Sequence, residues 1–261
     1  MRSTSVEMKT NNLRYEVCID SPEGARAAQE GGAHRVELCG ALSVGGITPS
    51  AGAIRATREA TDLGLHVLIR PRAGDFHFDA ADLDTMRRDI DMTGAWGADG
   101  VVFGVLLADG RVAMDACGAL IEAARPMSVT FHRAFDVTPD ALSALQQLTE
   151  LGIDRVLTSG QAASAWEGRA LLRRLVATAG ERIIVMPGAG ISETNASDLL
   201  RETGARELHF SARREVAASD TGTSAVAMGS DRTADRVRGV TDMARVRQII
   251  AASEGDGDLE L

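Results

Sequence analysis

The sequence predicts an α/β protein that folds as a single (β/α)8 barrel. Short β-rich runs alternate with helical patterns, eight such pairs can be counted, and the chain has 261 residues, a usual length for this fold. A doubly wound open sheet is the alternative. That fold usually carries a glycine-rich fingerprint after its first strand, whereas Cys18-Ile19-Asp20-Ser21-Pro22 stands there. The barrel is therefore preferred.

The expected elements alternate along the whole chain. Runs rich in Val, Ile and Leu predict strands, and Ala-rich runs with apolar residues at helical spacing predict helices. The expected strands cover residues 15–19, 35–39, 66–70, 101–105, 128–132, 155–158, 183–186 and 207–211. The expected helices cover residues 22–31, a segment that ends near 62, and residues 80–95, 114–124, 139–151, 163–179, 194–203 and 241–252.

Three segments fall outside the alternation. Residues 1–12 are polar and are expected to be a disordered tail, residues 13–253 form the barrel domain, and residues 254–261 form an acidic tail. Residues 213–239 are rich in Ser, Thr, Gly, Ala and Arg and have little periodicity. An irregular loop of this length indicates either a lid over a functional site or a mobile surface insertion.

Composition excludes several classes of function. A net charge of −9 argues against a nucleic-acid partner, because binding phosphates needs clustered cations. Lys9 is the single lysine, so Schiff-base chemistry, covalent pyridoxal phosphate and a Walker-type nucleotide loop are not expected. Three cysteines and no secretory signal predict a reduced, cytoplasmic protein. The apolar run at residues 101–108 is too short to cross a membrane.

Side-chain alternation along the strands predicts a polar barrel interior. Active sites of this fold lie at the carboxyl ends of the strands, and parity decides which side chains point inward. The candidate catalytic residues are Glu16, Glu37, Arg70, Arg72, His132 and His209, with Asp75 at the rim. Burying so many ionisable groups is costly unless they are paired. The alternative is a buried Glu–Arg network that stabilises the barrel. His34 and His66 are assigned to the opposite end of the barrel, in structural roles.

An anion site is expected where the seventh and eighth strands end. Gly188 and Gly190 precede Ser192, an expected helix N-cap, and Ser211 follows the eighth strand. Backbone N–H groups at such a turn can approach phosphate or carboxylate, and barrels often bind phosphate there. Tight turns need glycine in any case, so turn geometry alone is the alternative.

Cys18 and Cys39 share the inward parity on neighbouring strands, so their sulfurs are expected to lie close together. Thiolates select soft metals such as Cu(I), which makes the pair a candidate metal site. The alternative is that both are small buried hydrophobic residues, because no third ligand follows at a fixed spacing. Cys117, in a helical pattern, is assigned to packing.

A series of motifs between residues 14 and 250 is more specific than any single one. The motifs are Glu16-Val17-Cys18, Glu37-Leu38-Cys39, Gly45-Gly46-Ile47-Thr48-Pro49-Ser50, Arg70-Pro71-Arg72-Ala73-Gly74-Asp75-Phe76, Thr130-Phe131-His132-Arg133-Ala134-Phe135-Asp136, Leu157-Thr158-Ser159-Gly160-Gln161, Pro187-Gly188-Ala189-Gly190 and His209-Phe210-Ser211-Ala212. In this order they resemble the CutC family, which is named for copper homeostasis. The resemblance implies a cytoplasmic (β/α)8 barrel that forms a homo-oligomer, a dimer or tetramer, and binds copper. The family's proposed copper-binding cysteines correspond to Cys18 and Cys39.

Two functions are expected as alternatives. The first is a copper homeostasis protein that binds Cu(I) through Cys18 and Cys39. The second is a lyase, isomerase or hydrolase whose Glu, His and Arg side chains act on a small polar, anionic or sugar-like substrate. The family name favours the first. The number of ionisable residues inside the barrel favours the second, because a copper carrier does not need them.

Overall fold

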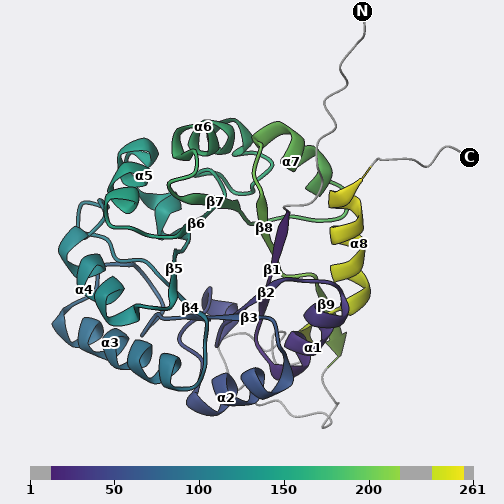
Figure 1. Ribbon diagram of the computed structural model, residues 1–261, viewed down its shortest axis with the longest axis horizontal. Coiled ribbons are helices and arrows are strands. Elements are labelled where there is room, and N and C mark those ends of the chain that lie inside the picture. The colour runs from purple at the N-terminus through teal and green to yellow at the C-terminus, as the bar shows by residue number, and fades with distance from the viewer. Residues whose placement is uncertain (1–12, 218–236, 256–261) are drawn as a thin grey trace, which may run out of the picture.

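The expected barrel is the observed fold in a computed structural model of the chain, which describes residues 13–217 and 237–255. Eight parallel strands form one sheet in the order β7-β6-β5-β4-β3-β2-β1-β8, so β1 to β7 pair in sequence order and β8 pairs with β1. Figure 1 shows the strands as an inner ring surrounded by helices. The strands are β1 (Arg14–Ile19), β2 (Arg35–Leu38), β3 (Gly64–Leu68), β4 (Gly100–Phe103), β5 (Ser128–Phe131), β6 (Arg155–Thr158), β7 (Ile184–Pro187) and β8 (Glu207–Phe210).

Eight α-helices of the described chain cover the outside of the sheet. Side-chain caps fix several of their starts: Ser21 accepts from the Gly24 N–H, and Asp79 accepts from the N–H groups of Ala81 and Asp82. Such caps satisfy backbone donors that have no partner within the helix. The helices are α1 (Pro22–Glu30), α2 (Ala51–Ala60), α3 (Ala80–Ala95), α4 (Met114–Ala124), α5 (Ala141–Glu150), α6 (Arg169–Ala179), α7 (Ala196–Thr203) and α8 (Met243–Glu254), with two 3₁₀ turns, η1 (Leu42–Val44) and η2 (Arg133–Val137).

The apolar core lies between the sheet and the helices and includes Val17, Val36 and Phe103. Cys39, Leu68 and Val102 form a separate small cluster, with Cys18 packed against it. The separation follows from strand alternation, which sends neighbouring side chains to opposite faces of a strand. The barrel interior is therefore a compartment of its own.

Successive levels of the barrel interior can be read from the strand register. The level nearest the amino ends of the strands holds Arg35, Gly100, Arg155 and Glu207, the next holds Glu16, His66, Thr130 and Met186, and the third holds Glu37, Val102, Leu157 and His209. Barrel interiors are usually filled by Val, Ile and Leu. Here each of the three levels contains ionisable side chains, with both arginines in the lowest one.

Residues 64–70 and 161–169 depart from the expected element boundaries. The third strand begins at Gly64 and ends at Leu68, two residues before the expected end. Helix α6 begins at Arg169 rather than at residue 163, because Gly160 and Gly168 pack backbone to backbone and hold a turn before it.

The segment 213–239, expected to be irregular, has ordered ends. Strands β9 (Arg213–Ala217) and β10 (Val237–Thr241) pair in antiparallel fashion, so the irregularity does not extend over the whole segment. The middle of the expected lid, residues 218–236, lies outside the described residues, and so do the expected tail at residues 1–12 and most of the tail at residues 254–261. No helix within the described residues is long and apolar enough to span a membrane.

A glycine on β4 makes room for an interior histidine, and this gives a stability prediction. A Cβ at Gly100 would lie 2.5 Å from His66 Nε2, whereas a Cβ at Gly52 in α2 would meet nothing within 4 Å. We expect Gly100→Ala to lower the free energy of unfolding by about 1–3 kcal/mol through overpacking. The control Gly52→Ala should raise it by about 0.5 kcal/mol, because alanine costs less backbone entropy in a helix. Urea unfolding measures both, and equal effects would contradict the close packing at Gly100.

Candidate functional site

The lower interior of the barrel holds four charged side chains in one network. Arg35 donates through Nε to Glu16 and through Nη2 to Glu207 at 2.6 Å. Arg155 donates to Glu207 from Nε at 2.6 Å and from Nη2 at 3.2 Å. All four residues are buried, and two guanidinium groups balance two carboxylates. The Glu–Arg network considered from the sequence therefore exists, but its arginines are Arg35 and Arg155, not Arg70.

His66 lies within the barrel interior beside Glu16, in mid-strand rather than at the start of its strand where the sequence placed it. Its Nδ1 is 3.7 Å from Glu16 Oε2. The reason is that β3 begins at Gly64, which places His66 in mid-strand with inward parity. Burial lowers the pKa of His66 to about 4 although Glu16 opposes the shift, so the imidazole is neutral near pH 7.

His209 joins the charged network to the level above it. Its Nδ1 lies 2.8 Å from Glu16 Oε1, and its Nε2 lies 3.6 Å from Glu37 Oε2. Burial disfavours a charged imidazole, but Cys18 and the two carboxylates outweigh burial and hold the pKa of His209 well above its usual value. Burial also disfavours the charged form of Glu16, which by itself would raise the pKa of Glu16. The charges of Arg35 and His209 more than reverse this effect, so the pKa of Glu16 is well below its usual value. A carboxylate–imidazolium pair is the result.

Glu37 lacks the cationic partner that Glu16 has in Arg35. Burial raises its pKa to about 8, and the attraction of His209 does not compensate. Glu37 stands opposite Cys18 in the register of β1 and β2 and two residues before Cys39. It therefore lies beside both thiols.

Cys18, Glu37 and Cys39 form a compact group of possible metal ligands. The two Sγ atoms are 3.9 Å apart, and one ligand atom from each of the three residues lies within 4.8 Å of the others. A hydrogen bond from the Cys39 thiol, helped by His209, lowers the pKa of Cys18 to about 5. The same bond, together with burial, raises the pKa of Cys39. Cys18 is thus the cysteine that loses its proton more readily, and Cys39 keeps its proton and donates it in the hydrogen bond.

Arg70 and His132 belong to a second group, centred on Phe76. The Arg70 guanidinium lies 5.0 Å from the centroid of the Phe76 ring, and the His132 ring lies 4.9 Å from the same centroid. Arg70 also donates to the carbonyls of Gly46 at 2.9 Å and Gly74 at 2.7 Å. Arg70 therefore fixes the loops around the mouth, and no direct contact joins it to Glu16 or Glu37 among the described residues.

His132 is buried and accepts the Ala134 N–H at Nδ1. Burial and the Arg70 charge lower its pKa to about 3. An unfolded chain takes up this proton near pH 6.5, so the contribution of His132 to stability is present above that pH and is lost as the pH falls toward 3.

We expect His132→Asn to flatten the acid side of the stability profile. In the wild type, His132 should remove about 1.4 kcal/mol of unfolding free energy for each pH unit below about 6.5, and the variant should lack this slope. Urea unfolding between pH 4.5 and 7 measures the difference, with the exposed His77→Asn as control. Parallel profiles for the wild type and His132→Asn would contradict the buried neutral imidazole.

Arg72 and Asp75 lie at the surface, which corrects the expectation that Arg72 points inward. Arg72 pairs with Asp82 at 2.9 Å and with Asp75 at 3.2 Å, and its side chain is 41% exposed. Because β3 ends at Leu68, strand alternation does not extend past Pro71. These two residues brace the loop before α3 rather than joining the interior groups.

The expected anion site is only partly available. The Gly188 N–H donates to the Thr158 carbonyl at 3.0 Å, so it is already used in the sheet. Gly190 has a φ of +71° and serves the turn, and Asn195 rather than Ser192 stands directly before α7. An anion bound by Gly190 and Ser211 stays a prediction.

The structure also reveals a buried carboxylate that the sequence reasoning left out. Asp136 accepts from the hydroxyls of Thr158 at 2.5 Å and Ser159 at 2.9 Å, and it pairs with Arg133 at 2.8 Å. Its place in the loop after the fifth strand was the available signal. These contacts tie the β5 loop to the β6 loop and thereby support the mouth of the barrel.

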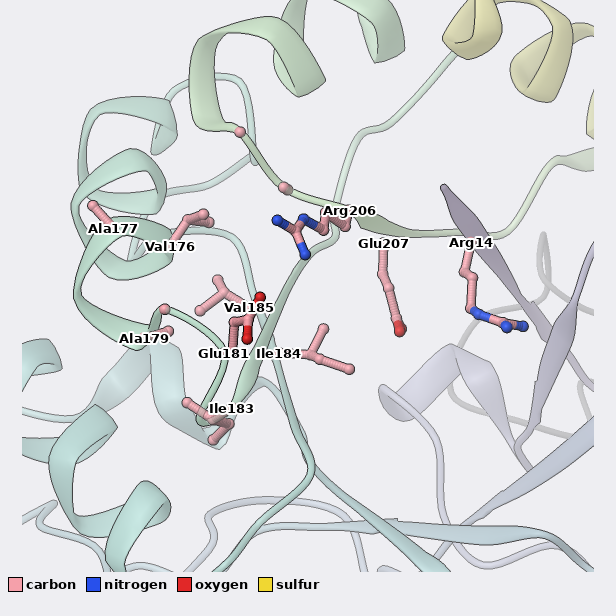
Figure 2. Close-up of a pocket in the computed structure, with 13 residues that line it drawn as sticks. Arg14, Val176, Ala177, Ala179, Glu181, Ile183, Ile184, Val185, Arg206 and Glu207 are labelled. Carbon is pink, nitrogen blue, oxygen red and sulfur yellow. The ribbon is translucent and has the colours of Figure 1, made fainter. Parts of the chain in front are cut away.

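A cavity of about 500 Å³ opens at the other end of the barrel, beside the amino ends of β7 and β8. These two strands meet through an isolated bridge between Gly188 and His209, and the cavity lies below it. Figure 2 shows Arg14, Ile184 and Glu207 at its border. Its lining contains no thiol and no imidazole, and barrel active sites open at the opposite end. The group of Cys18, Glu37 and Cys39 is therefore the better candidate site.

Comparisons with known proteins agree on one family. Residues 13–214 match the CutC family. A CutC family protein of Xanthomonas campestris is 51% identical over 238 residues, covering 91% of this chain and 98% of that protein. A human protein named copper homeostasis protein cutC homolog is 43% identical over 249 residues, covering 94% and 90% of the two chains.

Solved structures give the same result at the level of the fold. A CutC structure from Streptococcus agalactiae superposes with a TM-score of 0.73 at 31% identity, covering 76% of this chain and 98% of that one. A thiamine phosphate pyrophosphorylase from Pyrococcus furiosus superposes with a TM-score of 0.57 at 18% identity, covering 94% and 97%. The second likeness shows only a shared barrel fold.

Proposed function

The chain belongs to the CutC family, and from this premise we propose that it binds Cu(I) through Cys18 and Cys39 as a copper homeostasis protein. The observation that carries the proposal is the 3.9 Å separation of the two Sγ atoms. Pairs of thiolates are preferred ligands of Cu(I). The relatives named for copper homeostasis support the same metal.

The surroundings of the two thiols suit a bound monovalent cation. Two thiolates and one Cu(I) ion carry a net charge of −1, and burying an isolated charge is costly. The imidazolium of His209, held by Glu16 at 2.8 Å, supplies the balancing charge. The ion pairs below it thus provide a preformed electrostatic environment for the complex.

The proposal includes a cytoplasmic location and a homo-oligomeric state. Reduced thiols persist in the cytosol, and Cys18, Cys39 and Cys117 are all free. The enzyme alternative has less support, because Arg70 and His132 surround Phe76 whereas Glu16 and Glu37 contact His209. The carboxylates that an enzyme would use as acid or base and the arginine that would bind its substrate therefore lie in separate contact networks among the described residues.

A Cu(I) titration of the purified full chain under reducing, oxygen-free conditions tests the proposal. Two thiols hold one ion, so competition with a chromophoric Cu(I) chelator should give one Cu(I) per chain. Cys117→Ser should behave like the wild type, because Cys117 is buried in α4 against the Val105 carbonyl. Binding of no copper, or loss of binding in Cys117→Ser, would refute the proposed site.

A further inference from the structure

The spacing of the two thiols favours a metal ion with more than two ligands. A metal–sulfur bond is about 2.3 Å long, so two such bonds in line place the sulfurs about 4.6 Å apart, and two at a tetrahedral angle place them about 3.8 Å apart. The observed separation is 3.9 Å. The backbone keeps the two residues side by side, because the Cys39 N–H donates to the Ile19 carbonyl at 2.9 Å and holds β2 against β1. A bent sulfur–metal–sulfur angle leaves room on the ion for further donors.

Glu37 stands where a third donor is needed. Its carboxylate oxygen and both sulfurs lie within 4.8 Å of one another. No third ligand follows Cys18 or Cys39 at a metal-site spacing along the chain, because the strand arrangement rather than the local sequence brings the third donor to them. Glu37 and Cys39 are two residues apart and share the inward face of β2, and the strand register brings Cys18 beside them.

The donor set of two sulfurs and one oxygen distinguishes between metals. Cu(I) selects thiolates and thioethers, and a carboxylate adds little to its binding. Zn²⁺ accepts thiolate and carboxylate together in tetrahedral geometry, and sites with three protein ligands leave one position open.

We propose that Glu37 is a third metal ligand and that the Cys18–Glu37–Cys39 group binds Zn²⁺ with one coordination position open. The inference rests on the proposed metal site and extends the class of metal that it takes. His209, whose Nε2 lies 3.6 Å from Glu37 Oε2, orients the carboxylate as an outer-shell partner. Such partners orient ligands and raise metal affinity.

Replacing Glu37 separates the two metals. We expect the wild type to bind one Zn²⁺ per chain in competition with a chromophoric chelator, and Glu37→Gln to bind Zn²⁺ at least about tenfold more weakly, since losing even an outer-shell partner has that effect. The Cu(I) affinity of Glu37→Gln should stay within about threefold of the wild type, because both thiols remain. Cys117→Ser is the matched control for both metals, and thermal melting checks that each variant is folded.

Each outcome bears on one claim. Equal Zn²⁺ affinity of the wild type and a folded Glu37→Gln, or a wild type that binds Cu(I) but not Zn²⁺, overturns the role of Glu37 and leaves copper binding intact. A wild type that binds Zn²⁺ but not Cu(I) overturns the proposed function instead. If Glu37→Gln does not fold, X-ray absorption of the zinc-loaded wild type decides. Two sulfurs at about 2.3 Å with oxygen or nitrogen donors near 2.0–2.2 Å are expected, and a shell without sulfur refutes the site.

Discussion

Replacing Arg35 by methionine is expected to lower the free energy of unfolding by about 3–5 kcal/mol, the usual effect of removing one partner from a buried ion pair. Arg35 contacts both Glu16 and Glu207, so its loss leaves one carboxylate with no guanidinium and the other with Arg155 alone. For a chain of this size the melting temperature should fall by roughly 2–4 °C for each kcal/mol. Calorimetry or thermal circular dichroism measures the shift.

A surface ion pair gives the matched control. Arg88 pairs with Asp84 at 2.8 Å on α3, and its side chain is 71% exposed. Arg88→Met should leave the unfolding free energy almost unchanged, because solvent screens exposed pairs. If Arg35→Met were as mild as Arg88→Met, the four charges would not be acting as a buried network.

The double variant Cys18→Ser with Cys39→Ser is expected to weaken Cu(I) binding by more than about 100-fold. Even an outer-shell partner of a metal contributes 10–100-fold to affinity, and this change removes both sulfur ligands while leaving Glu37 and His209 in place. A hydroxyl is a poor ligand for a soft ion. Competition with a chromophoric Cu(I) chelator under reducing conditions measures the loss.

The fold of the double variant should survive, because serine is close to cysteine in size and both residues lie in the small interior cluster with Leu68 and Val102, outside the main apolar core. Circular dichroism spectra that match the wild type would confirm this. Copper bound by the folded double variant with wild-type stoichiometry and affinity would remove both cysteines from the copper site.

Side-chain alternation along the strands predicts most of the barrel interior. It correctly placed Glu16, Cys18, Glu37 and Cys39 inside the barrel, because alternation within a strand is a local property of the backbone. It failed for Arg72, which lies past the end of β3, where alternation no longer applies. The expected strand start at residue 66 put His66 at the edge of the barrel, whereas β3 begins at Gly64 and His66 lies in mid-strand beside Glu16.

The sequence by itself determined the barrel fold, the family and the closeness of the Cys18 and Cys39 thiols. These depend on periodicity, on the order of motifs and on neighbouring strands, all of which can be read along the chain. Only the tertiary structure decided that Arg35 and Arg155, rather than Arg70, neutralise the interior carboxylates, and that Glu37 joins the two thiols within 4.8 Å. Glu207 is 191 positions from Glu16, and both meet the same guanidinium of Arg35. Contacts of this kind depend on how the strands are staggered around the barrel, which no local pattern in the sequence specifies.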